Sequence, residues 1–233
     1  MSDSQSDQVD SILGHIAATI GDPSAWHNWP GGWPGDIETA LVDSIYSARA
    51  TYYGKSERGI YSRVIAWRDA RVRTTYSLNA LTSDIDAAGI DNWAASFGNR
   101  QLSPGRSASS EGGPSKAAAI RESSQTLLSS GIDVAEDITL ANAKSVWKAL
   151  QAVSGVGYAT ANYFLMLLGS PGVKPDRMIH RFLTDATGRT FTNAEAERIL
   201  FAVANRLAVE PHDLDHAIWS YESKRARGSH PPD

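Results

Sequence analysis

Apolar residues recur three and four positions apart along most of the chain, and this period constrains the fold more than any other feature. In one segment the apolar positions fall on a single helix face: Ile37, Ala40, Leu41, Ile45 and Ala48. The period also runs through residues 12–20, 60–67, 78–85, 93–97, 116–128, 142–151, 158–168, 177–186, 192–207 and 211–221. Alternating patterns typical of strands are hard to find. The sequence therefore predicts an all-α fold of about ten helices.

Two segments rich in Pro, Gly and small residues interrupt this period. Residues 26–35 carry three Trp among Pro and Gly, which predicts an extended loop whose rings pack on a domain surface or form a base-stacking wall. Residues 103–115, SPGRSASSEGGPS, have low complexity and predict a flexible surface loop inside the helical array.

Composition excludes several kinds of site. The 233 residues contain no Cys, so disulfides, thiolate zinc sites, iron–sulfur clusters and Cys nucleophiles are excluded. We expect no cofactor. His212 and His216 stand four residues apart, but capping and surface polarity explain them, and we expect no metal held by side chains. No apolar run is long enough to cross a bilayer, and the polar N-terminus resembles no signal peptide, so we expect a cytoplasmic, nucleoid-associated monomer without a membrane partner.

The net charge of −4 counts mildly against a nucleic-acid partner. The distribution of charge matters more than its sum. Six basic residues lie close together in the first third of the chain: Lys55, Arg58, Arg63, Arg68, Arg71 and Arg73. An ordinary solvated face explains any one of them, and a basic patch is the alternative.

Two predicted helices meet at residues 153–158, VSGVGY. Gly155 and Gly157 permit a turn with positive φ and expose backbone N–H groups at the start of the second helix. Such a helix N-terminus is an anion site by geometry and dipole. The pattern therefore indicates a hairpin that can hold a nucleic-acid phosphate without a basic side chain, with a plain helix–helix turn as the alternative.

Asp176 follows this hairpin after one helix and a short Gly/Pro loop, 19 residues past Gly157. It precedes a helix and is a natural N-cap. The cap position and the helix dipole both favour an ionised carboxylate. We expect the chain to run away from the hairpin and return with Asp176 to the same cleft.

Together, residues 153–161 and 175–182, VSGVGYATA and PDRMIHRF, resemble the signature of the helix-hairpin-helix DNA glycosylase superfamily, which includes endonuclease III and the adenine and alkylpurine glycosylases. The resemblance implies two helical subdomains flanking a cleft. Residues 36–170 would form the core subdomain, with the helix-hairpin-helix at about 142–169. Residues 1–35 and 171–233 would form the second subdomain from both termini.

The resemblance also assigns residues. It makes Asp176 the catalytic carboxylate and gives contacts with double-stranded DNA to Gly155, Val156, Gly157, Tyr158, Thr160 and Arg49. Base stacking or filling of the gap left by a flipped nucleotide would come from Tyr52, Tyr53 and Trp67. In the family, backbone carbonyls here often hold a monovalent cation, which corresponds to Val153 and Gly155.

One departure from the family sharpens the expected activity. Members that cut the strand by Schiff-base chemistry carry Lys just before the Thr-Ala pair, where this chain has Ala159. The sequence therefore predicts a monofunctional DNA N-glycosylase of base excision repair, which flips a damaged or modified base and hydrolyses its glycosidic bond without β-lyase activity. The alternatives are a non-catalytic DNA-binding protein that keeps the hairpin, and a glycosidase of the same fold acting on a modified nucleotide that is not damage.

Overall fold

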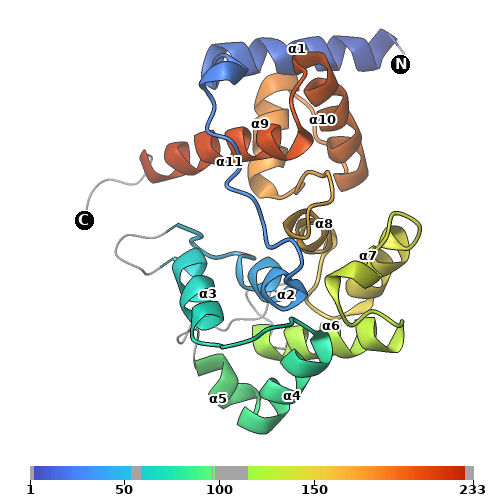
Figure 1. Cartoon of the computed structure of the whole chain (residues 1–233). Helices are drawn as coiled ribbons and strands as arrows, with labels where there is room; N and C mark the ends of the chain where they lie inside the picture. The colour runs from blue at the N-terminus through green and yellow to red at the C-terminus, as the bar shows by residue number, and fades with distance from the viewer. Residues whose placement is uncertain (1–2, 54–58, 96, 98–114, 229–233) are drawn as a thin grey trace. The chain divides into compact units, whose positions relative to one another are not determined.

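The structure is a computed structural model that describes residues 3–53, 59–95, 97 and 115–228. In this part of the chain it contains eleven α-helices, two short 3-10 helices and no strand (Figure 1). The prediction of an all-α fold is confirmed. The expected loop at 103–115 lies, except for Ser115, outside the described residues.

The chain divides into two compact units, which we describe separately. Unit 1 comprises Met1–Gly31 and Pro171–Asp233, and unit 2 comprises Gly32–Ser170. This division places residues 32–35 in unit 2, whereas the expected division placed them with the N-terminal segment, and the N–H of Trp33 donates to the carbonyl of Leu167 within unit 2. Unit 1 holds α1 (Asp3–Thr19), the 3-10 helix Pro23–Ala25, α9 (Arg177–Thr187), α10 (Asn193–Leu207) and α11 (Pro211–Gly228). Unit 2 holds α2 (Ile37–Tyr46), α3 (Ile60–Asp69), α4 (Leu78–Ala88), α5 (Ile90–Ala95), α6 (Lys116–Ser129), the 3-10 helix Ala135–Asp137, α7 (Ala143–Ala152) and α8 (Tyr158–Leu167).

Helix α2 forms the centre of unit 2, where it packs against α3, α6 and α8. All ten of its residues are buried, including the polar ones. A buried charge is costly unless it is paired, so the polar face of α2 needs partners inside the unit. The Glu38 carboxylate forms ion pairs with Arg71 and Arg73 and accepts the backbone N–H of Ser77. Burial raises the pKa of Glu38, and the two Arg charges oppose that rise.

These ion pairs explain most of the basic cluster of the first third of the chain. Arg68 donates to Asp36, and Arg71 and Arg73 also pair with Asp84. Arg63 donates to the carbonyl of Phe97. A basic patch does not describe these four residues, since their guanidinium groups make contacts within unit 2. Lys55 and Arg58 lie outside the described residues.

Gly32 lies directly against the end of α8. The N–H of Trp33 donates to the carbonyl of Leu167 at 2.5 Å, and a Cβ on Gly32 would come closer than 3.0 Å to the Leu167 backbone. Backbone atoms cannot move away from an added Cβ as the end of a flexible side chain can. The sequence 31–33, Gly-Gly-Trp, therefore needs glycine at its second position for this close approach.

We expect Gly32→Ala to destabilise the protein by about 1–3 kcal/mol, because the segment must move away from α8. Thermal unfolding should show a midpoint lowered by several degrees. Gly14→Ala is the matched control, because Gly14 is an exposed residue of α1 with no atom within 4 Å of an added Cβ. That change should raise the midpoint slightly through helix propensity. Equal midpoints for Gly32→Ala and the parent protein would contradict the close approach.

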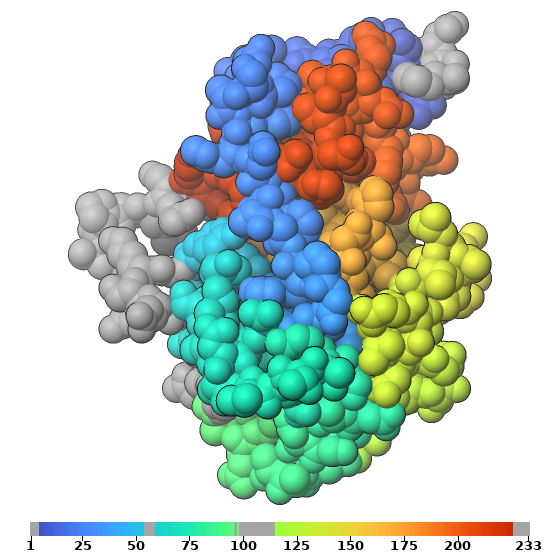
Figure 2. Space-filling view, in the orientation of Figure 1, coloured from blue at the N-terminus to red at the C-terminus, as the bar shows by residue number. Residues whose placement is uncertain are grey.

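Unit 1 has its own hydrophobic core, built from both ends of the chain. Helix α1 packs against α9 and α10, and α11 packs against α9 and α10 (Figure 1). In Figure 2 the blue surface of α1 lies beside the orange and red surface of the C-terminal helices. The core comprises Val9, Ile12, Ile16, Val173, Ile179, Phe182, Leu183, Ala196, Ile199, Leu200, Val203, Ala204, Leu214 and Ile218. Thr192 and Glu195 form a capping box at the start of α10.

Candidate functional site

The predicted hairpin is a tight turn between α7 and α8. Val153 ends α7, and its carbonyl accepts the N–H of Val156 at 3.1 Å. Gly155 adopts φ of 90°, a left-handed value that favours glycine, while Gly157 has an ordinary φ of −94° and precedes α8. Gly157, the N-cap residue of α8, has no side chain that could cap the helix. The start of α8 is therefore not capped by its own N-cap residue.

Two side chains hold α7 and α8 together beside this turn. The indole N–H of Trp147 donates to Oδ1 of Asn162 at 2.5 Å, and the Trp147 ring meets the ring of Tyr158 edge-on at 4.9 Å. Asn162 is buried, so its carbonyl oxygen needs such a donor. Sequence reasoning missed this pair, since 15 residues separate Trp147 from Asn162 and neither belongs to the glycine motif.

The structure separates the hairpin residues assigned to DNA into two groups. Gly157 is exposed, and Gly155 and Tyr158 are partly exposed, so they remain candidates for a phosphate contact. Val156 is buried and donates its N–H to the carbonyl of Val153, and Thr160 is also buried. These two residues hold the turn from inside, so we leave them out of the proposed contact surface.

The carbonyls implied to hold a monovalent cation belong to the same turn. The Val153 carbonyl accepts one hydrogen bond within the turn, and a carbonyl oxygen has two lone pairs. Carbonyl oxygen is the donor type that such cations take. The residues Val153 and Gly155 therefore fit the group.

The turn after α2 presents Arg49 at the surface of unit 2. Arg49 has φ of 54°, a left-handed value that is uncommon for a residue other than glycine. Lys116, the first residue of α6, stabilises this turn from inside. Its buried ammonium donates to the carbonyls of Tyr46 at 2.8 Å and Ala48 at 2.7 Å. A buried Lys that satisfies helix-end carbonyls could not be recognised from the hydrophobic pattern.

Tyr52 belongs to a polar network, whereas Tyr53 is exposed. The Tyr52 hydroxyl donates to Oδ2 of Asp43 at 2.8 Å and lies 3.2 Å from the Tyr163 hydroxyl. The Trp33 indole N–H donates to the same Asp43 oxygen at 2.8 Å. Burial and the Asp43 charge raise the pKa of Tyr52 far above its usual value, so its hydroxyl stays a donor. Tyr53 is 37% exposed and meets the Tyr52 ring edge-on.

The prediction for Trp67 needs correction. Trp67 is 8% exposed and packs against the rings of Trp93 and Phe97, with the Arg71 guanidinium 4.1 Å from its own ring centre. These contacts enclose the indole inside unit 2. Trp67 therefore serves packing, and only Tyr52 and Tyr53 remain as candidates for contact with a base.

Asp176 lies in unit 1, at the end of the Gly/Pro loop that leads into α9. Its Oδ1 accepts the N–H groups of Met178 at 2.7 Å and Ile179 at 3.3 Å, so the predicted N-cap is confirmed. The side chain is half-buried. In the described residues its Oδ2 makes no hydrogen bond or ion pair. One oxygen thus fixes the carboxylate, and the other is available for chemistry.

A second carboxylate stands beside this loop. Asp215, on α11, accepts the backbone N–H of Lys174 at 2.8 Å through Oδ1. Burial raises the pKa of Asp215 to about 7, and the Asp176 charge adds to the rise, while the Lys174 N–H and charge oppose it. In the sequence Asp215 stands between His212 and His216, and helical spacing alone does not relate it to Asp176.

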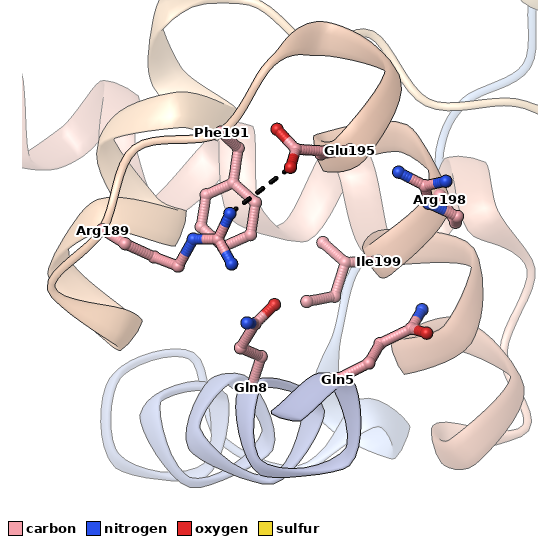
Figure 3. Close-up of a pocket in the computed structure, with 7 residues that line it drawn as sticks. All are labelled: Gln5, Gln8, Arg189, Phe191, Glu195, Arg198 and Ile199. Carbon is pink, nitrogen blue, oxygen red and sulfur yellow. Dashed lines mark hydrogen bonds and ion pairs between the residues drawn. The ribbon is translucent and has the colours of Figure 1, made fainter. Parts of the chain in front are cut away.

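The surface of unit 1 also contains a hollow of about 240 Å³ away from these carboxylates. Residues of α1, of α10 and of the segment before α10 line it: Gln5, Gln8, Arg189, Phe191, Glu195, Arg198 and Ile199. Figure 3 shows Arg189 lying across Phe191 toward Glu195, which it reaches at 3.4 Å. Arg189 is thus already paired, and Asp176 does not line the hollow.

The described ranges contain neither a metal-binding cluster of side chains nor a helix that could cross a membrane. No group of three or more His, Asp or Glu side chains there could hold a metal ion. None of the helices found there combines the length and the apolar character that crossing a membrane requires.

Comparison with known proteins gives one family and one solved structure. No curated protein matches the chain. The chain is similar to a solved structure described as "Structure of MBOgg1 in complex with low affinity DNA ligand", with 15% identity and a TM-score of 0.49. The likeness covers 82% of this chain and 61% of that one, so this chain spans less than two thirds of that protein's length. A family model described as "Domain of unknown function (DUF8548)" matches residues 10–223.

Proposed function

We propose that this chain, which belongs to the family described as "Domain of unknown function (DUF8548)", is a monofunctional DNA N-glycosylase with Asp176 as its catalytic carboxylate. One observation carries the proposal. Asp176 is fixed at the N-terminus of α9 through one oxygen, while its other oxygen makes no hydrogen bond or ion pair among the described residues. This is how a residue whose charge must face a substrate would be held.

The chemistry follows from that geometry. Cleavage of a glycosidic bond passes through a sugar cation that resembles an oxocarbenium ion. A fixed negative oxygen stabilises this cation, and the amides and dipole of α9 stabilise the negative charge in turn. Asp176 would hold the cation in place, receive a proton from the attacking water, or do both. Because Ala159 offers no amine, the reaction would end with an abasic site and an intact strand.

DNA binding is assigned to the hairpin of unit 2. The exposed Gly157 and the start of α8 would receive a phosphate through backbone N–H groups. A monovalent cation at the carbonyls of Val153 and Gly155, when bound, would supply positive charge beside that phosphate. Arg49, Tyr52 and Tyr53 would contact the flipped nucleotide or the gap that it leaves.

The test is a panel of labelled duplexes that each carry one damaged or modified base. After incubation with the protein, alkali converts abasic sites to strand breaks, while samples without alkali report lyase activity. We expect breaks for at least one lesion, and only after alkali. Binding of duplex DNA without base release on any lesion would favour the non-catalytic DNA-binding protein instead.

A further inference from the structure

Asp215 holds the loop that carries Asp176. Oδ1 of Asp215 accepts the N–H of Lys174 at 2.8 Å, and the carbonyl of Lys174 accepts the N–H of Asp176 at 2.6 Å. The peptide groups of Lys174 therefore connect the Asp215 carboxylate to the backbone of Asp176. Asp215 stands 41 residues from Lys174 in the sequence, so the fold rather than local turn chemistry brings them together.

Helix α11, which carries Asp215, is docked firmly on α9, whose first turn Asp176 caps. Leu214 and Ile218 on either side of Asp215 are fully buried in the core of unit 1. Further along, Arg181 of α9 pairs with the buried carboxylate of Glu222 on α11 and donates to the Glu222 carbonyl at 3.1 Å. All these residues belong to unit 1, so Asp215 has a fixed base from which to hold the loop.

The charges that act on Asp215 are those of Asp176 and Lys174. On its own helix His212 and His216 are neighbours, and burial lowers the pKa of His216, which disfavours its charged form. With its pKa near 7, Asp215 loses its proton in the range where Asp176 is expected to act. An ionised Asp215 accepts the Lys174 N–H more strongly than a neutral one, and it adds negative charge near Asp176.

We propose that Asp215 is a positioning residue for the reaction: by holding the Lys174 backbone it sets where the Asp176 carboxylate stands relative to the sugar. The inference rests on the proposed function of Asp176. It adds a second carboxylate that touches neither substrate nor reacting atoms and acts through the loop. Ionisation of Asp215 strengthens its hydrogen bond with the Lys174 N–H and makes the electrostatic potential at a sugar cation more negative.

The test compares Asp215→Ala, Asp215→Asn and the control Asp213→Asn in single-turnover base release between pH 5.5 and 8.5. Asp215→Ala removes the acceptor, and we expect release on the order of 10- to 100-fold slower, with little change in DNA affinity. Asp215→Asn keeps an oxygen acceptor but cannot ionise. Its rate of base release should equal the parent's near pH 6 and be several-fold lower than the parent's at pH 8. Asp213 lies on α11 two residues before Asp215, and Asp213→Asn should keep the parent's pH profile.

The outcomes separate this inference from the proposed function. If Asp215→Ala releases base at the parent's rate while Asp176→Asn is inactive, Asp215 does not position the loop and the glycosylase proposal stands. A uniform loss for Asp215→Asn at every pH would indicate a merely structural role and overturn the inference. If Asp176→Asn is fully active, the glycosylase proposal itself fails.

A measurement without DNA keeps the inference testable in every case. The folded pKa of Asp215 lies above its unfolded value of about 3.9. Between pH 4 and 7 the folded state therefore holds a proton that the unfolded state has lost, so stability falls as pH rises. Asp215→Asn should remove this fall and raise the unfolding midpoint at pH 8 more than at pH 5. Identical pH dependence in the variant and the parent would overturn the part of the inference that depends on ionisation of Asp215.

Discussion

Asp176→Asn should abolish base release while leaving DNA binding intact. Asn is a good N-cap, so its side-chain oxygen can still accept the N–H groups of Met178 and Ile179 and keep α9 in place. What the substitution removes is the negative charge that would face the sugar cation. We expect the rate to fall on the order of 10³-fold or more, as when a group dedicated to transition-state charge is lost.

Single-turnover kinetics with saturating protein measure this loss, and a gel-shift assay on the same duplex measures affinity. Asp176→Ala is a useful companion, because it also removes the cap and should cost about 1 kcal/mol of stability. The Asn variant should unfold at nearly the parent's temperature. Full base release by Asp176→Asn would show that the carboxylate is only a helix cap.

Gly157→Asp should weaken binding to every DNA sequence alike. An added Cβ at Gly157 meets no atom within 4 Å, and the backbone φ of −94° suits any residue, so the variant should fold normally. Its carboxylate would stand where the phosphate is expected. Losing a charge-assisted hydrogen bond costs about 1.5–3 kcal/mol, which corresponds to roughly 10- to 100-fold in Kd.

Gly157→Ala is the matched control, since it adds the same Cβ without charge and leaves the amides in place. It should bind DNA within a few-fold of the parent. Because phosphate contacts carry no sequence information, the loss for Gly157→Asp should be equal on unrelated duplexes. Unchanged affinity for Gly157→Asp would remove the hairpin from the DNA contact surface.

Features decided within a few residues could be predicted from the sequence. The helical period of α7 and α8, the glycine turn between them, the Asp176 cap and the Thr192 capping box each depend on neighbours along the chain. Local propensity and capping chemistry act at that range, and they agree with the fold at each of these places.

Features decided by partners distant in sequence could not be predicted. The hydrophobic face of α2 identified a helix, but nothing in it showed that the opposite face is also buried and that Glu38 needs Arg71 and Arg73. The same arginines therefore looked available to solvent or DNA. Asp215 was missed for a related reason, because its partner Lys174 reaches it only after α9 and α10 have folded back.

Unit 1 is built from two segments far apart in the sequence, and this has a consequence for folding during synthesis. Its core joins α1 to helices that begin more than 150 residues later, so its contacts are of very high sequence separation. During synthesis, the apolar side chains of Val9, Ile12 and Ile16 must wait until α9 to α11 have left the ribosome, whereas unit 2 is complete earlier. We therefore expect α1 to be the segment most in need of chaperone protection in the nascent chain, and unit 1 to be the slower unit to fold.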